Sequence, residues 1–110
     1  MTSYEFGDVL LVDFPQVAAP GRKLRPAIVV LDVGDDDVVV VPITSVQRSA
    51  AGDHPISNWR QAGLRIASWV RLAKVTTVLK HELGRQVGRL SAEDRHELVT
   101  AWNSLYDLRP

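Results

Sequence analysis

The stretch AIVVLDVGDDDVVVVPITS, residues 27–45, decides the fold of this chain. It contains two runs rich in β-branched residues, 27–33 and 38–43, on either side of a short acidic connection that includes Gly34. Dense β-branched side chains favour strands over helices, and a short glycine-bearing connection between two such runs is typical of a β-hairpin. The sequence therefore predicts an antiparallel hairpin that turns near residues 34–37.

Four more segments have the composition of short strands, and Pro, Gly and polar residues separate them. The predicted strands are residues 9–14, 64–71, 74–79 and 82–90. Two long loops are predicted at residues 15–25 and 46–57, with one helical turn near residues 59–62.

A single amphipathic helix is predicted at the C-terminal end. Ser91 can cap its first turn, and Asp94, three residues later, fits the second position of a capping box. The predicted apolar face comprises Leu98, Trp102 and Leu105, with Val99 and Tyr106 beside them. Short strands followed by one helix predict a mainly β fold, a small, strongly curved antiparallel sheet or barrel closed by a C-terminal helix.

Length and composition exclude several classes of protein. The 110 residues predict one domain, residues 1–110, and the chain contains no cysteine, which excludes disulfide scaffolds, zinc ribbons and thiol catalysis. The longest apolar runs, 38–43 and 27–31, are too short to cross a bilayer, and the first five residues lack the features of a signal peptide. We therefore expect a cytoplasmic protein with no membrane partner.

The formal net charge is zero, with 13 basic and 13 acidic side chains, which at first sight argues against a nucleic-acid partner. The charges are segregated along the chain, however. Residues 38–81 contain six basic side chains and one acidic one, Asp53, whereas residues 1–37 contain seven acidic and three basic side chains. Because the basic residues are concentrated in one segment, the sequence is compatible with an anionic ligand despite its zero net charge.

The sequence motifs of most cofactor-dependent and hydrolytic enzymes are absent. The chain has no glycine-rich nucleotide-binding loop and no Gly-x-Ser-x-Gly serine nucleophile motif. Its three histidines are scattered without metal-ligand spacing, and the adjacent carboxylates at residues 35–37 point in alternate directions from a turn. We therefore expect neither a cofactor nor a metal site.

Arg25 and Thr44 stand at nearly equal distances from the predicted hairpin turn. A guanidinium and a hydroxyl would therefore meet at one rim of the sheet, and Pro26 favours an extended backbone that presents the arginine. Such a pair suits a phosphate group, because it combines bidentate N–H donors with a neutral donor. From the residues alone, the alternative is a solvent-exposed arginine beside a threonine that ends a strand.

The three tryptophans are candidates for the core or for stacking on a nucleobase. We predict core positions for Trp69 and Trp102. Trp59 either packs in the core or stacks on a base at the basic surface.

Nearly the whole chain resembles the MazF/PemK family of bacterial toxins in the order and spacing of short motifs. The motifs are Gly7-Asp8-Val9, Val12-Asp13-Phe14-Pro15, Arg25-Pro26-Ala27, Pro42-Ile43-Thr44-Ser45, Asp53 to Trp59, Ala62-Gly63-Leu64, Ser68-Trp69-Val70-Arg71, Lys74-Val75 and Gly88-Arg89-Leu90-Ser91. Each motif is weak alone, but their ordered co-occurrence is specific. The segment 16–22 departs from the more polar pattern of many relatives, so base preference does not carry over.

The resemblance implies an SH3-like or plasmid-toxin β-barrel of the MazF/CcdB type, a homodimer, and the toxin of a type II toxin–antitoxin module with a cognate antitoxin. It also implies metal-independent, sequence-specific cleavage of single-stranded RNA, including mRNA, that leaves 2′,3′-cyclic phosphate and 5′-hydroxyl ends and inhibits translation and growth. In the matching motifs the catalytic Arg falls on Arg25 and the catalytic Thr on Thr44, with Ser45 as a helper. The candidates for RNA binding are Arg22, Lys23, Arg48, Trp59, Arg71 and Lys74.

Two other functions remain open at this point. The chain could be a binding module of the same fold with weak or lost activity, or a toxin of the same barrel class that poisons DNA gyrase by protein–protein contact. Gyrase-directed relatives use exposed residues of the C-terminal helix. The Arg-Pro and Pro-Ile-Thr-Ser motifs fit the ribonuclease branch better.

Overall fold

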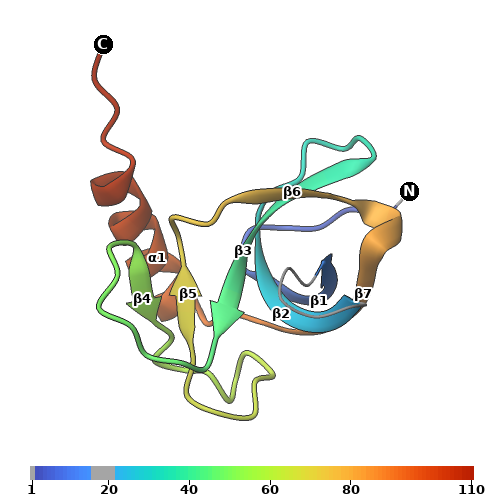
Figure 1. The fold of residues 1–110 in the computed structure, drawn as a ribbon, viewed down its shortest axis with the longest axis horizontal. Helices are drawn as coiled ribbons and strands as arrows, with labels where there is room; N and C mark the ends of the chain where they lie inside the picture. The colour runs from blue at the N-terminus through green and yellow to red at the C-terminus, as the bar shows by residue number, and fades with distance from the viewer. Residues whose placement is uncertain (1, 16–21) are drawn as a thin grey trace.

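The predicted hairpin is present and consists of β2 (Arg22–Leu31) and β3 (Asp37–Thr44) (Figure 1). The computed structural model describes residues 2–15 and 22–110, without the side chains of residues 15, 22 and 23. The other elements are β1 (Asp8–Pro15), β4 (Asp53–Pro55), β5 (Trp69–Arg71), β6 (Thr76–Leu79), a 3₁₀ turn η1 (Lys80–Glu82), β7 (Leu83–Arg89) and α1 (Ala92–Leu105).

The described strands form one antiparallel sheet in the order β4-β5-β3-β2-β1-β7, and β6 also pairs with β3. The sheet curves strongly at the end formed by β1, β2 and β7, while α1 lies at the β4–β5 end (Figure 1). The predicted fold class, a small curved antiparallel sheet with one C-terminal helix, is confirmed. Among the described residues, the strand pairings form an open path rather than a closed ring.

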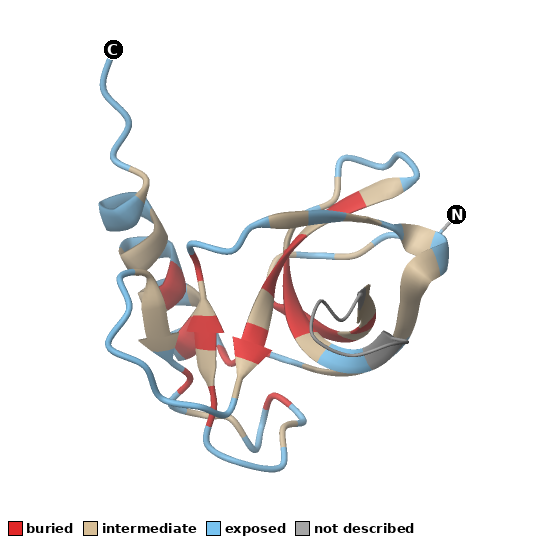
Figure 2. Cartoon of the chain, viewed as in Figure 1, coloured by how far each residue is buried: buried red, intermediate tan, exposed pale blue. Residues whose placement is uncertain are grey.

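The central strands are apolar on both faces because each face packs into a separate hydrophobic core. One core contains Val9, Ile28 and Val41 together with Leu98 of α1. The other core lies inside the curved end of the sheet and contains the alternate positions Leu10, Val12, Ala27, Val29, Val38 and Val40. Figure 2 shows buried residues along β2, β3 and β5 and on the side of α1 that faces the sheet. Because both faces of these strands are buried, their sequences are continuous apolar runs rather than alternating apolar and polar residues.

Several predicted boundaries are wrong. Only residues 69–71 of the predicted strand 64–71 are a strand, β4 lies inside the predicted loop 46–57, and residues 59–62 form a hydrogen-bonded turn rather than helix. Residues 22–25 of the predicted loop 15–25 belong to β2, and residues 16–21 lie outside the described part of the chain. Residues 53–55 and 69–71 are strands because they pair with each other, and residues 22–25 extend β2 because they pair with residues 12–15 of β1.

The helix begins as predicted but its capping box is not formed. The Ser91 Oγ accepts a hydrogen bond from the Asp94 backbone N–H at 3.0 Å. The Asp94 carboxylate does not return to the cap; it accepts the backbone N–H groups of Ser57 at 3.0 Å and Asn58 at 2.9 Å. Leu98 is buried, whereas Leu105 is 36% exposed, so the predicted apolar face is wrong at its C-terminal end. Among the described residues, no helix has the length and apolarity to span a membrane.

Asp94 therefore ties the segment between β4 and β5 to the helix, and Asp94→Asn is expected to destabilise the fold. Asp94 is 3% exposed, and hydrogen bonds to a charged acceptor contribute about 1.5–3 kcal/mol each. Because asparagine keeps one acceptor oxygen, we expect a loss of about 1.5–3 kcal/mol in the free energy of unfolding, measured by urea denaturation. Glu93→Gln, one position earlier on an exposed part of the helix, should cost less than about 1 kcal/mol. Equal effects of the two substitutions would contradict this role for Asp94.

Asp32 stabilises the connection between β2 and β3 through its carboxylate. Its carboxylate accepts the backbone N–H groups of Tyr4 and Gly34, each at 2.8 Å, and pairs with Lys80 Nζ at 3.0 Å. The hydrogen bonds from Tyr4 and Gly34, and then Lys80, lower the pKa of Asp32 below its ordinary value of 3.8. The ionised carboxylate thus joins three separate parts of the chain.

A lowered pKa in the folded state means that Asp32 stabilises the fold above pH 3.8 and loses this contribution as the pH falls through its folded-state pKa. We expect Asp32→Asn to lower the Tm at pH 7. The difference in Tm from the wild type should shrink steadily below pH 3.8. Thermal unfolding followed by circular dichroism from pH 7 to pH 2.5 measures both effects, and a difference that is independent of pH would refute the assignment.

Candidate RNA-binding groove

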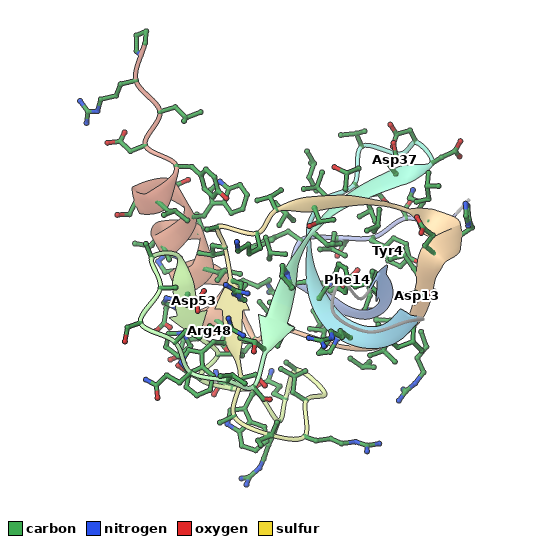
Figure 3. The ribbon with its side chains drawn as sticks, in the orientation of Figure 1. Tyr4, Asp13, Phe14, Asp37, Arg48 and Asp53 are labelled. Carbon is green, nitrogen blue, oxygen red and sulfur yellow. The ribbon has the colours of Figure 1, made fainter. Side chains whose placement is uncertain are left out.

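An open groove of about 500 Å³ lies beside the end of the hairpin that is opposite its turn. Its polar side chains are Arg25, Thr44, Ser45, Arg48, Arg65, Ser68 and Arg85, and we call it the arginine groove. They come from β2, the end of β3 and the segment after it, the segment between β4 and β5, and β7. Figure 3 labels Arg48 and Asp53 toward the β4–β5 end of the sheet and Tyr4 and Phe14 toward its curved end.

The hairpin register places Arg25 and Thr44 at the same rim. The pairing of β2 with β3 ends at Ala27 and Pro42, and Arg25 and Thr44 each lie two residues beyond this last pair on their strands. The Thr44 Oγ1 accepts the Val46 backbone N–H at 3.1 Å, which leaves the hydroxyl proton available for a ligand. Arg25 and Thr44 therefore both line the arginine groove, and a contact between their side chains and their catalytic role stay predictions.

The groove is strongly positive although the chain as a whole is neutral. Four arginines line it, at positions 25, 48, 65 and 85, and its described lining contains no Asp or Glu. None of the four forms an ion pair with a carboxylate of the described residues. Unpaired guanidinium groups on concave walls concentrate positive potential, which favours a polyanion such as RNA.

Three of the predicted RNA-binding residues lie outside the groove. Arg71 pairs with Asp53 at 3.6 Å, and Lys74 is exposed but does not line the groove. Trp59 is half-buried against the core, and the Arg60 guanidinium lies 4.7 Å from the centre of its ring. The side chains of Arg71 and Trp59 are therefore engaged in contacts within the fold. For Arg22 and Lys23 the structure describes only the backbone, in β2.

The other two tryptophans differ in their position relative to the core. Trp102 packs against the core and lies 4.4 Å from the ring of Tyr106, as predicted for a core residue. Trp69 is half-buried and belongs to neither core, so its predicted core position is wrong. Side chains alternate along β5, and it is Val70 that points into the core.

Arg65 and Arg85 are not among the residues predicted to bind RNA. Arg65 lies in the predicted strand 64–71, of which only residues 69–71 are a strand, and Arg85 lies in β7, within the predicted strand 82–90. The period of two that places Arg85 and Val87 on the same side of β7 was the available signal. Among the described residues, no group of three or more His, Asp or Glu side chains could hold a metal ion.

Residues 5–105 match the model of the family described as PemK-like, MazF-like toxin of type II toxin-antitoxin system. No curated protein gives a significant match.

Three solved structures illustrate the similarity. Mycobacterium tuberculosis toxin MazF-mt6 has 25% sequence identity and a TM-score of 0.76, with 94% of this chain and 99% of that chain covered. An endoribonuclease in complex with its cognate antitoxin from a mycobacterial species has 20% identity and a TM-score of 0.77, with 98% and 99% covered. The MazE-MazF complex (Form-II) from Deinococcus radiodurans has 16% identity and a TM-score of 0.74, with 96% and 97% covered. With a family match over almost its entire length, the chain belongs to the PemK-like, MazF-like toxins of type II toxin–antitoxin systems.

Proposed function

We propose that this chain is an endoribonuclease toxin that cleaves single-stranded RNA in the arginine groove. The observation that carries the proposal is the presence of Arg25 and Thr44 in one groove with four arginines in all, none of which forms an ion pair with a carboxylate in the described part of the chain. The family membership supports it, as does the endoribonuclease named among the structural relatives. An mRNA substrate would place the action of the protein in the cytoplasm, where cleavage would inhibit translation and growth.

The proposed reaction is a transfer of the phosphoryl group within the RNA. The ribose 2′-oxygen loses its proton and attacks the adjacent phosphorus, and the bond from phosphorus to the 5′-oxygen breaks. The departing 5′-oxygen takes up a proton, so the products are a 2′,3′-cyclic phosphate and a 5′-hydroxyl. No water is consumed in this step, and no metal ion is required to generate the nucleophile.

Arg25 is assigned to stabilise the negative charge that develops on the non-bridging phosphate oxygens. Its guanidinium offers fixed N–H donors, which are most effective when they are already oriented before the reaction. Thr44 donates a further hydrogen bond to the same phosphate, and Ser45 is exposed beside it. The guanidinium holds its proton far above neutral pH, so charge stabilisation is the principal role of Arg25, rather than proton transfer.

Mapping of cleavage ends tests the proposal directly. Purified protein is incubated with a long RNA in the presence of EDTA, and the termini of the fragments are determined. We expect discrete fragments with 2′,3′-cyclic phosphate and 5′-hydroxyl ends at an unchanged rate in EDTA. Loss of cleavage in EDTA would refute the metal-independent reaction, and RNA binding without any cleavage would indicate a binding module instead.

The proposal includes two protein partners. We infer a cognate antitoxin and a homodimer from family membership and from the relatives that were solved together with an antitoxin. Size-exclusion chromatography with light scattering, with and without a candidate antitoxin, tests both. A protein that stays monomeric at micromolar concentration would contradict the dimer.

A further inference from the structure

One wall of the arginine groove is formed by the segment between β4 and β5, residues 56–68, which we call the wall segment. It contributes five lining residues, Gly63, Leu64, Arg65, Ile66 and Ser68. All residues of the wall segment are described, and none of them belongs to a helix or a strand. Its position beside the groove therefore depends on hydrogen bonds within the segment and on contacts with neighbouring elements.

Hydrogen bonds within the wall segment make it a compact unit. The Ile56 N–H donates to the Ser68 carbonyl oxygen at 3.0 Å and so joins the two ends of the segment. The Ala62 N–H donates to the Asn58 carbonyl oxygen at 3.2 Å, which links the first residues of the segment to the part that reaches the groove. A displacement near residue 58 is therefore passed on to the groove.

The start of α1 anchors the wall segment. The Asp94 carboxylate accepts the backbone N–H groups of Ser57 at 3.0 Å and Asn58 at 2.9 Å. The Asn58 Nδ2 donates to the Ser91 Oγ, the cap of α1, at 2.8 Å. Asp94 and Ser91 are only 3% and 7% exposed, and hydrogen bonds that are shielded from water are electrostatically stronger. Asp94 is not one of the described residues that line the groove, so its influence on the groove passes through the wall segment.

The wall segment also rests on β7, at a contact where neither backbone leaves room for a side chain. A Cβ added at Gly63 would overlap the Val87 carbonyl oxygen, and one added at Gly88 would overlap the Ala62 carbonyl oxygen. The two backbones are thus in direct contact. When the anchor at the start of α1 is lost, the wall segment can tilt about this contact, which moves Arg65 relative to the rest of the groove.

We propose that Asp94 is a positioning residue for RNA binding, which acts by holding the wall segment, and with it Arg65, at its place in the arginine groove. The inference rests on the proposed function. Arg25 and Thr44 lie on β2 and β3, whereas the hydrogen bonds of the Asp94 carboxylate go to the wall segment. Loss of the anchor should therefore weaken RNA binding and leave the chemical step at the phosphate nearly unchanged.

Steady-state cleavage of a defined RNA by Asp94→Asn tests this role. The asparagine side chain offers one acceptor oxygen and turns its amide donors toward the other backbone N–H, so either Ser57 or Asn58 loses its partner. We expect KM to rise about fivefold, as for coupling between connected sites, and kcat to stay within about twofold of the wild type. A purely structural role predicts a different pattern, because a smaller folded fraction lowers kcat and leaves KM unchanged.

Asp32→Asn is the matched control for stability. Asp32 also accepts two backbone N–H groups, those of Tyr4 and Gly34, but it lies at the turn of the hairpin, at the end opposite the groove. Its substitution should lower the Tm and leave KM at the wild-type value. Asn58→Ala is a second test of the anchor, because it removes the hydrogen bond to the helix cap and keeps the carboxylate of Asp94. It should raise KM about twofold, even where Asp94→Asn is poorly folded.

A double-mutant cycle shows whether Asp94 acts through Arg65. Binding of a 2′-O-methyl RNA, which lacks the nucleophilic hydroxyl, is measured by fluorescence anisotropy. We expect the increase in Kd for Asp94→Asn with Arg65→Gln to fall about threefold short of the product of the two single increases. Arg48→Gln is the comparison, because Arg48 lines the groove from the segment between β3 and β4. Its effect combined with that of Asp94→Asn should equal the product within about twofold.

The outcomes separate this inference from the proposed function. If the wild-type protein does not bind the 2′-O-methyl RNA, the proposed RNA groove is wrong, and the inference fails with it. If the wild type binds and cleaves RNA but Asp94→Asn and Asn58→Ala keep its KM, or Asp32→Asn raises KM equally, the positioning role alone is overturned. Equal results of the Arg65 and Arg48 cycles would likewise show that Asp94 does not act through the wall segment.

Discussion

Arg25→Ala is expected to reduce RNA cleavage by about two to three orders of magnitude, the typical effect of removing one oriented donor to a developing oxyanion. The single-turnover rate on a defined RNA, with excess protein, measures the loss without a contribution from product release. The side chain is exposed at the rim of the arginine groove and forms no hydrogen bond or ion pair within the described residues. Its removal should therefore leave the Tm unchanged.

Two matched variants separate this effect from a general loss of charge. Arg109→Ala removes the same charge from a site outside the groove, where Arg109 pairs with Asp107 at 2.9 Å, and should retain full cleavage. Arg25→Lys keeps the charge but loses the planar set of donors, so its rate should lie between those of the wild type and Arg25→Ala. Full cleavage by Arg25→Ala would remove Arg25 from the mechanism.

Gly63→Ala is expected to destabilise the fold by about 2–5 kcal/mol and to impair cleavage as well. Gly63 has φ +88°, where a side chain costs about 1–2 kcal/mol, and an added Cβ would overlap the carbonyl group of Val87 in β7. Overpacking of this kind costs about 1–3 kcal/mol more. Urea unfolding measures the loss of stability.

Cleavage is affected because Gly63 belongs to a wall of the arginine groove. Gly63, Leu64, Arg65, Ile66 and Ser68 together form one wall of the arginine groove, so a shift of the Gly63 backbone away from β7 displaces that wall. Cleavage should therefore fall even at temperatures at which the variant is folded.

Gly34→Ala is the control for the backbone conformation alone. Gly34 has φ +95°, but an added Cβ there would have no atom within 4 Å. It should cost only about 1–2 kcal/mol and leave cleavage unchanged. Equal destabilisation by the two substitutions would show that the contact with β7 does not matter.

The hairpin, the C-terminal helix and the placement of Arg25 and Thr44 at the same end of the hairpin could all be predicted from the sequence. Each depends on local information: the β-branched runs on either side of a short connection, the cap and apolar spacing of the helix, and the similar distances of Arg25 and Thr44 from the turn. The role of Asp94 could not be predicted in this way. Its spacing from Ser91 fits a capping box, yet its carboxylate bonds to Ser57 and Asn58, which are more than thirty residues away in the chain.

The zero net charge of the chain argues at first against RNA as a partner, and the distribution of charge along the sequence indicates only that the central segment is basic. The tertiary structure decided which arginines act together. Arg65 and Arg85 join Arg25 in one groove because β4 pairs with β5, β7 pairs with β1, and Gly63 packs against β7. These are contacts between distant segments, and they depend on how the whole sheet packs rather than on the pattern around either arginine. For that reason the local sequence revealed the candidate catalytic pair, and only the packed sheet revealed the groove around it.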